Sequence, residues 1–400
     1  MKLTVPPGRV KKVLWLTSWY PGPPDPVLGD FIQRHAEAVA EFVPVDLVYV
    51  VQQGPQVFQK EEVVLKNKRG NLAETILIFP FKPTGFSLID KIRYQLTYLD
   101  YSQKIVEGHI KTVGRPDLIH VHIPIKAGLV ARRLSKKYGI PFIVSDHSSH
   151  YEKEAEDSFY NRSYFFRNNT RKVLKDAVAV TNVSSAAANI MQRLFRLQNV
   201  RTIHNVVDQR HFFYRKRAAR SRDRFRFLHV SSLSSQKNFP AILEALDLLN
   251  GKTRNWEMVV CGPQPERFSQ EVENRGLQSQ LRFDGEVAYS AVAAEMQKAD
   301  ALVLFSLHEN FPCVVIEALC CGLPVISSKA GGVAEAIDRS NGILVEKNDV
   351  EALSDAMREM MENYGGYNSK SISEQALKKY NYRQIGKEFL ELYEWVLKRT

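Results

Sequence analysis

Cysteine is scarce in this sequence of 400 residues, which contains only four. They lie at Cys261, Cys313, Cys320 and Cys321 without the spacing of a metal site, so neither a bound metal nor a disulfide framework is expected. Long apolar runs are also missing, since none approaches the length of a membrane-spanning helix and residues 1–12 lack the apolar core of a signal peptide. We therefore expect a cytoplasmic protein that is neither integral to a membrane nor secreted by that route.

Length and hydrophobic patterning indicate two α/β domains. The chain exceeds what one hydrophobic core usually serves, and apolar, strand-like runs alternate with helical patterns twice along it. Strands are expected at 13–17, 45–51, 75–81, 118–122, 142–146, 178–182 and 200–205, and then at 227–231, 258–261, 281–283, 301–305, 325–328 and 343–346. This alternation predicts two Rossmann-like, doubly wound parallel sheets, in domains at 1–210 and 211–381. A base-rich segment at 215–226 is expected to be a solvated linker.

The segment 306–332 says most about function. The run before it predicts a buried strand, and Pro312 suits the first residue of a helix that reaches about Cys321. Backbone N–H groups and the helix dipole converge at such a helix start, so a pyrophosphate can bind there without a metal. Glu309 in the loop and Glu317 in the second helical turn flank this point, and both carboxylates can face one ligand. The spacing suits hydroxyl groups on the two rings of a nucleotide sugar.

The residues His308 to Pro312, followed by Glu317-Ala318-Leu319 and Gly331-Gly332, resemble the nucleotide-sugar site of family 4 glycosyltransferases. The resemblance implies the GT-B architecture, in which two Rossmann-like domains face across a cleft, and a retaining reaction without a metal or other cofactor. It implies that Glu309 contacts the transferred sugar, that Glu317 contacts the ribose, and that amides along Asn310, Phe311 and Cys313 hold phosphate. No Asp-x-Asp pair, the metal anchor of the other large transferase fold, occurs in the sequence.

Other positions of the second domain match the donor site of that family. Ser232 and Lys237 follow the first strand of this domain, where the family binds the donor phosphates, and the charge of Lys237 can neutralise a departing diphosphate. The family usually has an arginine where this chain has Ser232. Gly262 and Gly285 follow the next two strands and fit the wall that binds the nucleobase, although ordinary turns explain them equally well.

In the first domain, Gly29 and Asp30 precede a helix expected to begin near Ile32, and they are candidates for a phosphate or acceptor loop. A plain turn capped by Asp30 is the alternative. His147 ends the fifth strand, where the resemblance implies a catalytic histidine beside the donor sugar. His120 and His122 match the His-x-His of the family. Either one of them faces the cleft, or both serve packing. The resemblance also implies that a last helix, within 382–400, crosses back to the first domain.

Charge is concentrated in the first domain, where residues 1–210 contain 30 Lys and Arg against 19 Asp and Glu. Within it, the segment 160–175 interleaves aromatic with basic side chains, a pattern suited to an anionic membrane surface and a lipid-linked acceptor. An ordinary helix with its aromatics in the core is the alternative. No nucleic-acid fold motif accompanies this charge, so no nucleic-acid partner is expected.

These observations predict a metal-independent, retaining glycosyltransferase. It would move a hexose from a nucleotide-diphosphate sugar to a saccharide or lipid-linked acceptor in cell-surface polysaccharide or glycolipid synthesis. Its place would be the cytoplasm, with peripheral contact at the inner face of the membrane as a further possibility. A sugar-nucleotide epimerase of the same fold and a non-catalytic basic adaptor that retains the fold are the alternatives.

Overall fold

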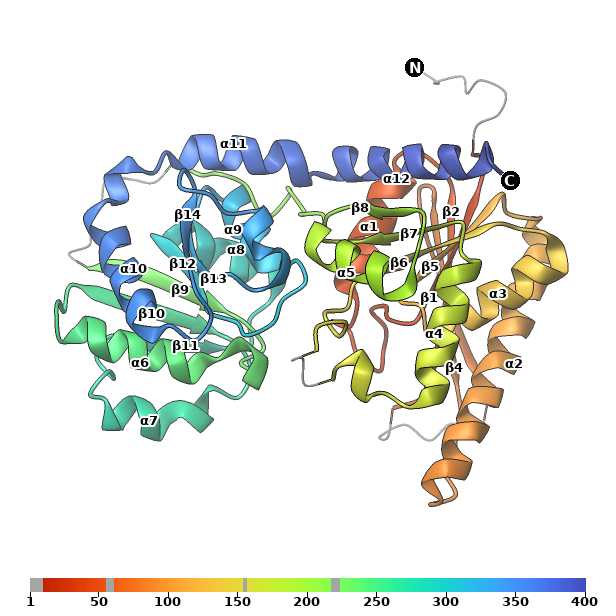
Figure 1. The fold of residues 1–400 in the computed structure, drawn as a ribbon, viewed down its shortest axis with the longest axis horizontal. Helices are drawn as coiled ribbons and strands as arrows, with labels where there is room; N and C mark the ends of the chain where they lie inside the picture. The colour runs from red at the N-terminus through yellow and green to blue at the C-terminus, as the bar shows by residue number, and fades with distance from the viewer. Residues whose placement is uncertain (1–9, 55–60, 154–156, 217–223) are drawn as a thin grey trace. The chain divides into compact units, whose positions relative to one another are not determined.

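The computed structural model describes residues 10–54, 61–153, 157–216 and 224–400, and the chain divides into two compact units (Figure 1). The first domain comprises the chain up to Val206 together with Tyr382–Thr400, and the second comprises Val207–Asn381. The sequence placed this boundary at 210, a few residues further on. Most of the predicted linker at 215–226 lies outside the described residues.

The first domain contains an eight-stranded sheet with the strand order β3-β4-β2-β1-β5-β6-β7-β8. Its strands are β1 (Val13–Thr17), β2 (Val45–Gln52), β3 (Val63–Arg69), β4 (Leu72–Phe79), β5 (Leu118–His122), β6 (Phe142–Asp146), β7 (Ala179–Asn182) and β8 (Val200–Thr202). Neighbouring strands are parallel except for β3, which forms an antiparallel hairpin with β4. The sequence did not predict this antiparallel edge, because β3 carries mostly exposed, polar side chains and was not recognised as a strand.

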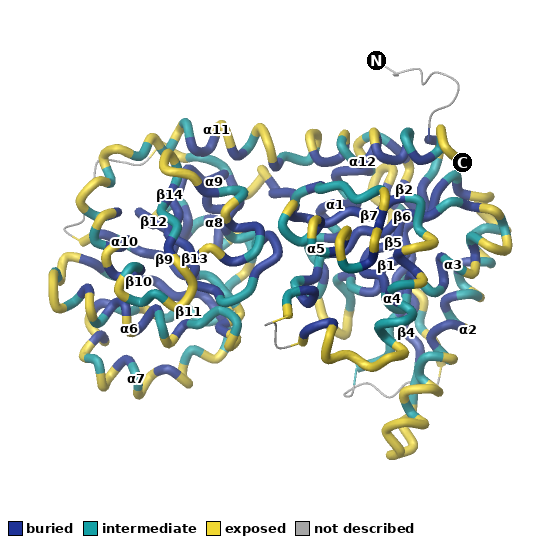
Figure 2. The backbone as a smooth tube through the Cα atoms, viewed as in Figure 1, coloured by how far each residue is buried: buried dark blue, intermediate teal, exposed yellow. Residues whose placement is uncertain are grey.

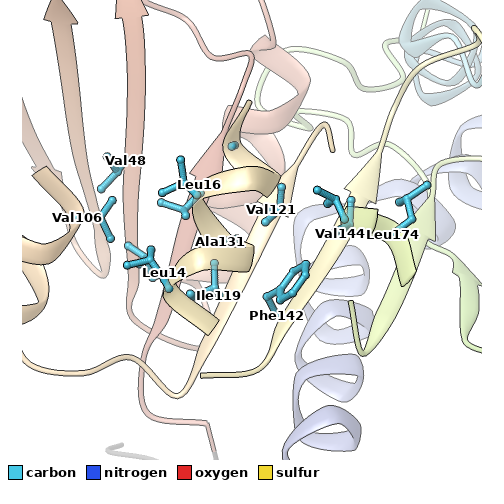
Figure 3. Close-up of a cluster of buried hydrophobic side chains, with 14 of the residues drawn as sticks. Leu14, Leu16, Val48, Val106, Ile119, Val121, Ala131, Phe142, Val144 and Leu174 are labelled. Carbon is cyan, nitrogen blue, oxygen red and sulfur yellow. The ribbon is translucent and has the colours of Figure 1, made fainter. Parts of the chain in front are cut away.

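Helices cover both faces of this sheet. They are α1 (Asp30–Ala40), α2 (Ser87–Val113), α3 (Ala127–Tyr138), α4 (Tyr164–Asp176), α5 (Ser185–Phe195) and α12 (Tyr382–Leu397). Leu14 and Leu16 of β1 pack with residues of α2, α3 and α4 on one face (Figure 3), whereas Val13 and Trp15 pack with α1 and α12 on the other. Burial on both faces explains why β1 is a continuous apolar run in the sequence.

The last helix of the chain, α12, packs against α1 in the first domain. Gly386 permits this approach, because a Cβ atom at that position would lie 2.2 Å from the carbonyl oxygen of Ala38. Further along α12, the hydroxyl group of Tyr393 lies 2.7 Å from Nδ1 of His120. The end of the chain therefore contributes to the core of the first domain.

The second domain contains a six-stranded, wholly parallel sheet with the order β11-β10-β9-β12-β13-β14. The strands are β9 (Phe225–Val230), β10 (Trp256–Cys261), β11 (Leu281–Gly285), β12 (Ala301–Leu304), β13 (Val325–Ser328) and β14 (Gly342–Val345). The helices are α6 (Phe239–Asn250), α7 (Ser269–Asn274), α8 (Tyr289–Lys298), α9 (Cys313–Cys320), α10 (Val350–Glu362) and α11 (Ser369–Tyr380). The predicted class of two Rossmann-like domains is confirmed.

Burial follows this layering, with the central strands buried, the edge strands β3, β8 and β11 less so, and the outer helix faces exposed (Figure 2). Among the helices that the structure describes, none combines the length and the hydropathy that crossing a bilayer requires.

Candidate active site

The site in the second domain lies where its sheet changes winding direction. From β9 the chain adds β10 and β11 on one side and then β12, β13 and β14 on the other. The loops after β9 and β12 therefore leave neighbouring strands at the same edge and diverge, and ligands of open α/β sheets bind in the crevice between such loops. Lys237 belongs to the first of these loops and Glu309 to the second.

The two loops are held together by hydrogen bonds. Leu307 donates its N–H to the carbonyl oxygen of Gln236 at 2.8 Å, and the side chain of Gln236 donates to the carbonyl oxygen of His308. Next to these bonds, Nζ of Lys237 lies 2.6 Å from Oε1 of Glu309, and both side chains are largely buried. The structure thus brings together two of the three residues that were predicted to be catalytic. Lys237 has to leave Glu309 if it is to neutralise a diphosphate.

A glycine pair supports the loop that carries Glu309. Gly332 donates its N–H to the carbonyl oxygen of Asn310 at 2.8 Å. Gly331 has a φ of +53°, and a Cβ atom there would lie 1.7 Å from the carbonyl oxygen of Glu309. Any side chain at this position would displace the loop, so the glycine is required for the position of the carboxylate.

The helix after Glu309 begins one residue later than predicted. Pro312 is its N-cap in an extended conformation, and α9 starts at Cys313. The prediction of Pro312 as the first helical residue is therefore wrong, although the N-terminus of α9 still follows Glu309 directly. The ring of Phe311 is buried and packs against Tyr380, with 5.9 Å between centroids.

Glu317 lies in the second turn of α9, as predicted, and its side chain is buried. Its Oε1 accepts a hydrogen bond of 2.7 Å from the hydroxyl group of Tyr289. Tyr289 is the first residue of α8, and its ring packs at 4.8 Å on that of Phe212. The sequence interpretation missed Tyr289, although its position just after the loop of Gly285 could have indicated it.

The loop after β9 is fixed by a buried histidine that was also missed. Nδ1 of His229 lies 2.9 Å from the carbonyl oxygen of Val303, and its Nε2 lies 2.8 Å from Oγ of Ser231. Burial lowers the pKa of His229 to about 4, so the ring is neutral at pH 7. The N–H on Nδ1 then donates to the carbonyl, and Nε2 accepts from Ser231, which in turn accepts a bond from the N–H of Leu233 at 3.0 Å.

The remaining predicted donor residues lie after β9 (Ser232), after β10 (Gly262) and at the end of β11 (Gly285). Ser232 is exposed and donates to Oγ of Ser234 at 3.3 Å. Gly262 donates its N–H to the carbonyl oxygen of Gly285 at 2.8 Å, and a Cβ atom on it would lie 2.3 Å from the carbonyl oxygen of Ser231. Gly262 is therefore required for the close approach of the loops after β9 and β10, whatever it contacts in a ligand.

In the first domain, His147 follows β6 within a group of aromatic rings. Its Nε2 lies 3.1 Å from Nδ1 of His122, and its ring packs on Phe31 at 4.9 Å and on His35 at 5.5 Å. Burial lowers the pKa of His35 to about 4 and the pKa values of His122 and His147 well below their ordinary range. All three rings are neutral at pH 7, so His147 can donate or accept a hydrogen bond without carrying a charge.

His120 and His122 both lie in the interior of the first domain. His122 stacks on Trp15 at 4.1 Å and contacts His147. His120 lies 2.7 Å from both the Tyr393 hydroxyl and Oγ of Ser145. His120 therefore serves packing in the core, as one of the two predictions had it, whereas His122 connects the core to His147.

The Gly29 loop differs from its prediction in two respects. The helix α1 begins at Asp30 rather than near Ile32, and Gly29 is its N-cap. Asp30 does not cap the helix, because its Oδ2 accepts from Nη1 of Arg34 at 2.7 Å. Gly29 has a φ of +73°, and a Cβ atom there would lie 2.8 Å from the carbonyl carbon of Trp19. The glycine is thus needed to fold the loop, independently of any ligand.

A cavity of about 320 Å³ lies beyond the carboxyl ends of β1, β2 and β5, at the winding change of the first sheet. Its wall is mostly aromatic and apolar, but it also includes the charged residues Lys126, Asp157 and Arg162. The lining includes Ser18, Trp19, Tyr49, Ile123, Lys126 and Tyr151. Nζ of Lys126 lies 2.9 Å from the hydroxyl group of Tyr94, which also lines the cavity.

Two family models match this chain, "Glycosyltransferase Family 4" over residues 32–211 and "Glycosyl transferases group 1" over residues 211–384. The chain belongs to glycosyltransferase family 4. This glycosyltransferase is 24% identical over 363 residues to the putative teichuronic acid biosynthesis glycosyltransferase TuaC of Bacillus subtilis. The matched region covers 86% of this chain and 88% of that protein. It is 22% identical to the GDP-mannose:cellobiosyl-diphosphopolyprenol alpha-mannosyltransferase of Xanthomonas campestris, over 88% of this chain and 97% of that protein.

Solved structures agree with the fold of this glycosyltransferase. Sucrose-phosphate synthase from Thermosynechococcus elongatus superposes with a TM-score of 0.74 at 18% identity, over 98% of this chain and 100% of that one. HepE from Anabaena, in complex with UDP, superposes with a TM-score of 0.69 at 17% identity, over 95% of this chain and 99% of that one. At these identities the likeness establishes the shared GT-B fold.

Proposed function

We propose that this glycosyltransferase moves a hexose, with retention of configuration, from a nucleotide-diphosphate sugar to a saccharide or lipid-linked saccharide. The reaction needs no metal and serves the synthesis of a cell-surface polysaccharide or glycolipid. The observation that carries the proposal is the ion pair of Lys237 and Glu309, which joins the two loops at the winding change of the second sheet. A cation beside a helix N-terminus suits a diphosphate, and a carboxylate beside it suits the hydroxyl groups of a sugar.

Relatives with named ligands favour this choice of substrates. HepE was solved with UDP and with UDP-glucose, and the Xanthomonas enzyme is named for GDP-mannose and a diphosphopolyprenol-linked cellobiose. A nucleotide sugar as donor and a saccharide on a lipid carrier as acceptor are therefore the substrate classes that we propose here. A lipid carrier would bring the enzyme to the inner face of the cytoplasmic membrane.

In the proposed donor complex, Glu317 accepts hydrogen bonds from the ribose and Tyr289 holds this carboxylate in place. Backbone N–H groups along Asn310, Phe311 and Cys313, with Ser232 opposite, bind the diphosphate. The loops of Gly262 and Gly285 present backbone groups to the edge of the base.

During transfer, Lys237 moves from Glu309 to the leaving diphosphate and stabilises its developing charge. Glu309 is then free to hold a hydroxyl group of the sugar, and a diphosphate oxygen takes the proton of the acceptor on the same face. His147, as a neutral ring, donates a hydrogen bond to the sugar near the reacting carbon. The cavity of the first domain receives the acceptor, whose rings suit the aromatic wall formed by Trp19 and Tyr49.

The two carboxylates provide the first test. Glu317→Ala should weaken the binding of a free nucleoside diphosphate by about 1.5–3 kcal/mol, because a charged hydrogen-bond acceptor is lost. Glu309→Ala should not weaken that binding, because it frees Lys237 for the diphosphate, and it should lower turnover with the complete donor. Calorimetry with UDP and GDP, followed by transfer assays, measures both effects. Equal losses of nucleoside diphosphate binding in the two variants would contradict the assignment.

Metal dependence provides the second test. Activity should persist in a chelator, whereas Lys237→Ala should lower kcat by about 10²–10³, as the loss of a preorganised charge does at other active sites. Lys329→Ala is the matched control, because Lys329 pairs with the exposed Glu346 in the same domain. Activity that vanishes in chelator and returns with magnesium or manganese would overturn the metal-independent mechanism.

A further inference from the structure

The first turns of α2 expose a row of large apolar side chains. Leu88, Ile89, Ile92 and Leu96 are 73%, 50%, 55% and 61% exposed, and Phe86, just before the helix, is 69% exposed. At 3.6 residues per turn the four helical residues fall within an arc of about 100°. We call these five residues the apolar stripe. Figure 2 shows this end of α2 as the most continuously exposed part of the helix.

The stripe continues a face of α2 that is buried elsewhere. Leu99 and Val106 lie on the same side of the helix and pack into the core of the first domain. The helix has 27 residues and is about 40 Å long, and its four buried residues all lie between Tyr98 and Val106. Its first ten residues present the same apolar face to solvent, and isolated exposed residues do not account for such a row.

Basic side chains border the stripe. Lys91 and Arg93 lie on either side of the apolar arc, and Lys82 precedes the helix. Asp90, the acidic residue within 82–96, accepts hydrogen bonds from the N–H groups of Thr84 and Gly85 at 2.7 and 3.0 Å, and it also forms an ion pair of 3.6 Å with Arg93. An apolar arc bordered by bases is the pattern of a helix that lies in the plane of a membrane interface.

A groove of about 360 Å³ runs from α2 across α3 to α4. Its lining includes Gln95 and Leu99 of α2, Arg132, Arg133 and Lys136 of α3, and Phe165 of α4. Arg132 is paired with Asp176, whereas Arg133 and Lys136 are exposed and form no ion pair with any acid that the structure describes. Phe165 and its neighbour Tyr164 are 62% and 74% exposed, so the aromatic side chains of the predicted 160–175 contact are not all in the core.

We propose that the apolar stripe and this groove together form a docking face for an anionic phospholipid bilayer. The stripe enters the boundary between head groups and acyl chains, and Arg133 and Lys136 bind lipid phosphate groups at the surface. The excess of bases selects an anionic membrane over a second protein chain, because these bases extend the positive field of the first domain. The inference goes beyond the proposed transfer reaction, since none of these residues belongs to the proposed donor site or to its catalytic residues.

Vesicle sedimentation tests the stripe. Purified protein should bind vesicles of equimolar phosphatidylcholine and phosphatidylglycerol at low salt, bind phosphatidylcholine vesicles far less, and dissociate as salt rises. Combining Leu88→Gln, Ile92→Gln and Leu96→Gln should weaken binding at least about tenfold, because three partly inserted apolar side chains are lost. The control combines Val27→Gln and Leu248→Gln, which alter exposed apolar residues elsewhere and should bind like the parent.

The groove is tested separately. Arg133→Gln with Lys136→Gln should weaken vesicle binding about 25-fold at low salt, since each base near an anionic surface contributes about fivefold. Lys347→Gln with Lys378→Gln removes the same charge from the exposed surface of the second domain and should change little. All variants should melt at the parent temperature and bind UDP like the parent, so a failure of docking is distinguishable from a failure of the proposed donor site.

Three results would overturn the docking face. The first is a parent protein that does not sediment with the anionic vesicles. The second is sedimentation that neither the stripe variant nor the groove variant reduces, which would place the contact elsewhere. The third is a concentration-dependent dimer that the stripe variant abolishes in a protein indifferent to vesicles, which would assign the face to a second copy of the chain.

Discussion

Six strands of the first sheet, β4-β2-β1-β5-β6-β7, follow the same order as the six strands of the second sheet, yet the two winding changes carry different side chains. In the second domain this edge holds a buried ion pair, Lys237 with Glu309, and a second buried carboxylate, Glu317. In the first domain the corresponding edge holds neutral imidazole rings, including His122 and His147, next to a largely aromatic cavity. Neutral imidazole rings and aromatic side chains suit hydroxyl-bearing ligands, whereas a buried cation suits a diphosphate. The fold alone does not decide which ligand binds, because the side chains at the strand ends do.

The largest difference that we expect between the two domains is in their stability at low pH, which should fall more in the first domain than in the second. Burial lowers the pKa of His35 to about 4 from an ordinary value near 6.5, and it also lowers those of His120, His122 and His147. Below about pH 6.5 the unfolded chain therefore binds protons that the folded domain does not, so stability falls as the pH falls. The ring of His35 alone accounts for about 3 kcal/mol once the pH reaches its folded pKa.

The second domain has one such ring at its site, His229. Hydrogen exchange of peptides from β5 and β9, corrected for intrinsic rates and measured at pH 7 and pH 5, should show the larger loss of protection in β5. His35→Gln should reduce the difference, because one suppressed protonation is removed. Equal losses of protection in β5 and β9 would show that the buried histidines do not make the first domain more sensitive to acid.

A smaller effect should appear at the glycine that supports Glu309. Gly331→Ala places a methyl group where the carbonyl oxygen of Glu309 now lies, at a φ of +53°. We expect a loss of about 1–3 kcal/mol in the stability of the second domain, together with reduced donor turnover. Thermal melting and transfer assays measure the two effects. Gly365→Ala is the control, because nothing lies within 4 Å of the added Cβ atom. A Gly331→Ala protein with parental melting and turnover would show that the loop adapts.

The smallest expected effect concerns Tyr289. Tyr289→Phe removes the hydroxyl group that donates to Glu317 and should weaken nucleoside diphosphate binding by about 0.5–1.5 kcal/mol. The apolar packing of the ring on Phe212 is retained, so the melting temperature should change little. Tyr367→Phe, in the same domain, is the matched control for calorimetry. Unchanged binding in Tyr289→Phe would mean that Glu317 needs no positioning by this residue.

Much of the fold could be predicted from the sequence, because strands buried on both faces are continuous apolar runs. β1, β5, β6 and β13 lie at the predicted residues. The edge strand β3 could not be found in this way, since its side chains are mostly polar and exposed and its pairing with β4 depends on backbone hydrogen bonds. The apolar stripe of α2 escaped notice for a related reason, because the same residues in a buried helix would look identical.

The candidate site was only partly visible in the sequence. Glu309 and Lys237 could be named because each belongs to a recognisable run, although their ion pair depends on the folding of two loops 72 residues apart. Tyr289 and His229 were missed, since their roles arise from contacts across the sheet and not from neighbouring residues. Topology would have indicated their loops, but it could not have specified the hydrogen bonds that they form.

The position of α12 has a consequence for the order in which the chain folds. The second domain, Val207–Asn381, is continuous and precedes α12 in the sequence, so the first domain receives α12 last. Until then Trp15, which packs with Phe389, and His120, whose Nδ1 contacts the Tyr393 hydroxyl, lack these partners. The domain that begins to emerge first is thus the last to be completed. A chain that ends at Asn381 would contain the whole second domain but would leave apolar surface of the first domain exposed, because α12 would be missing.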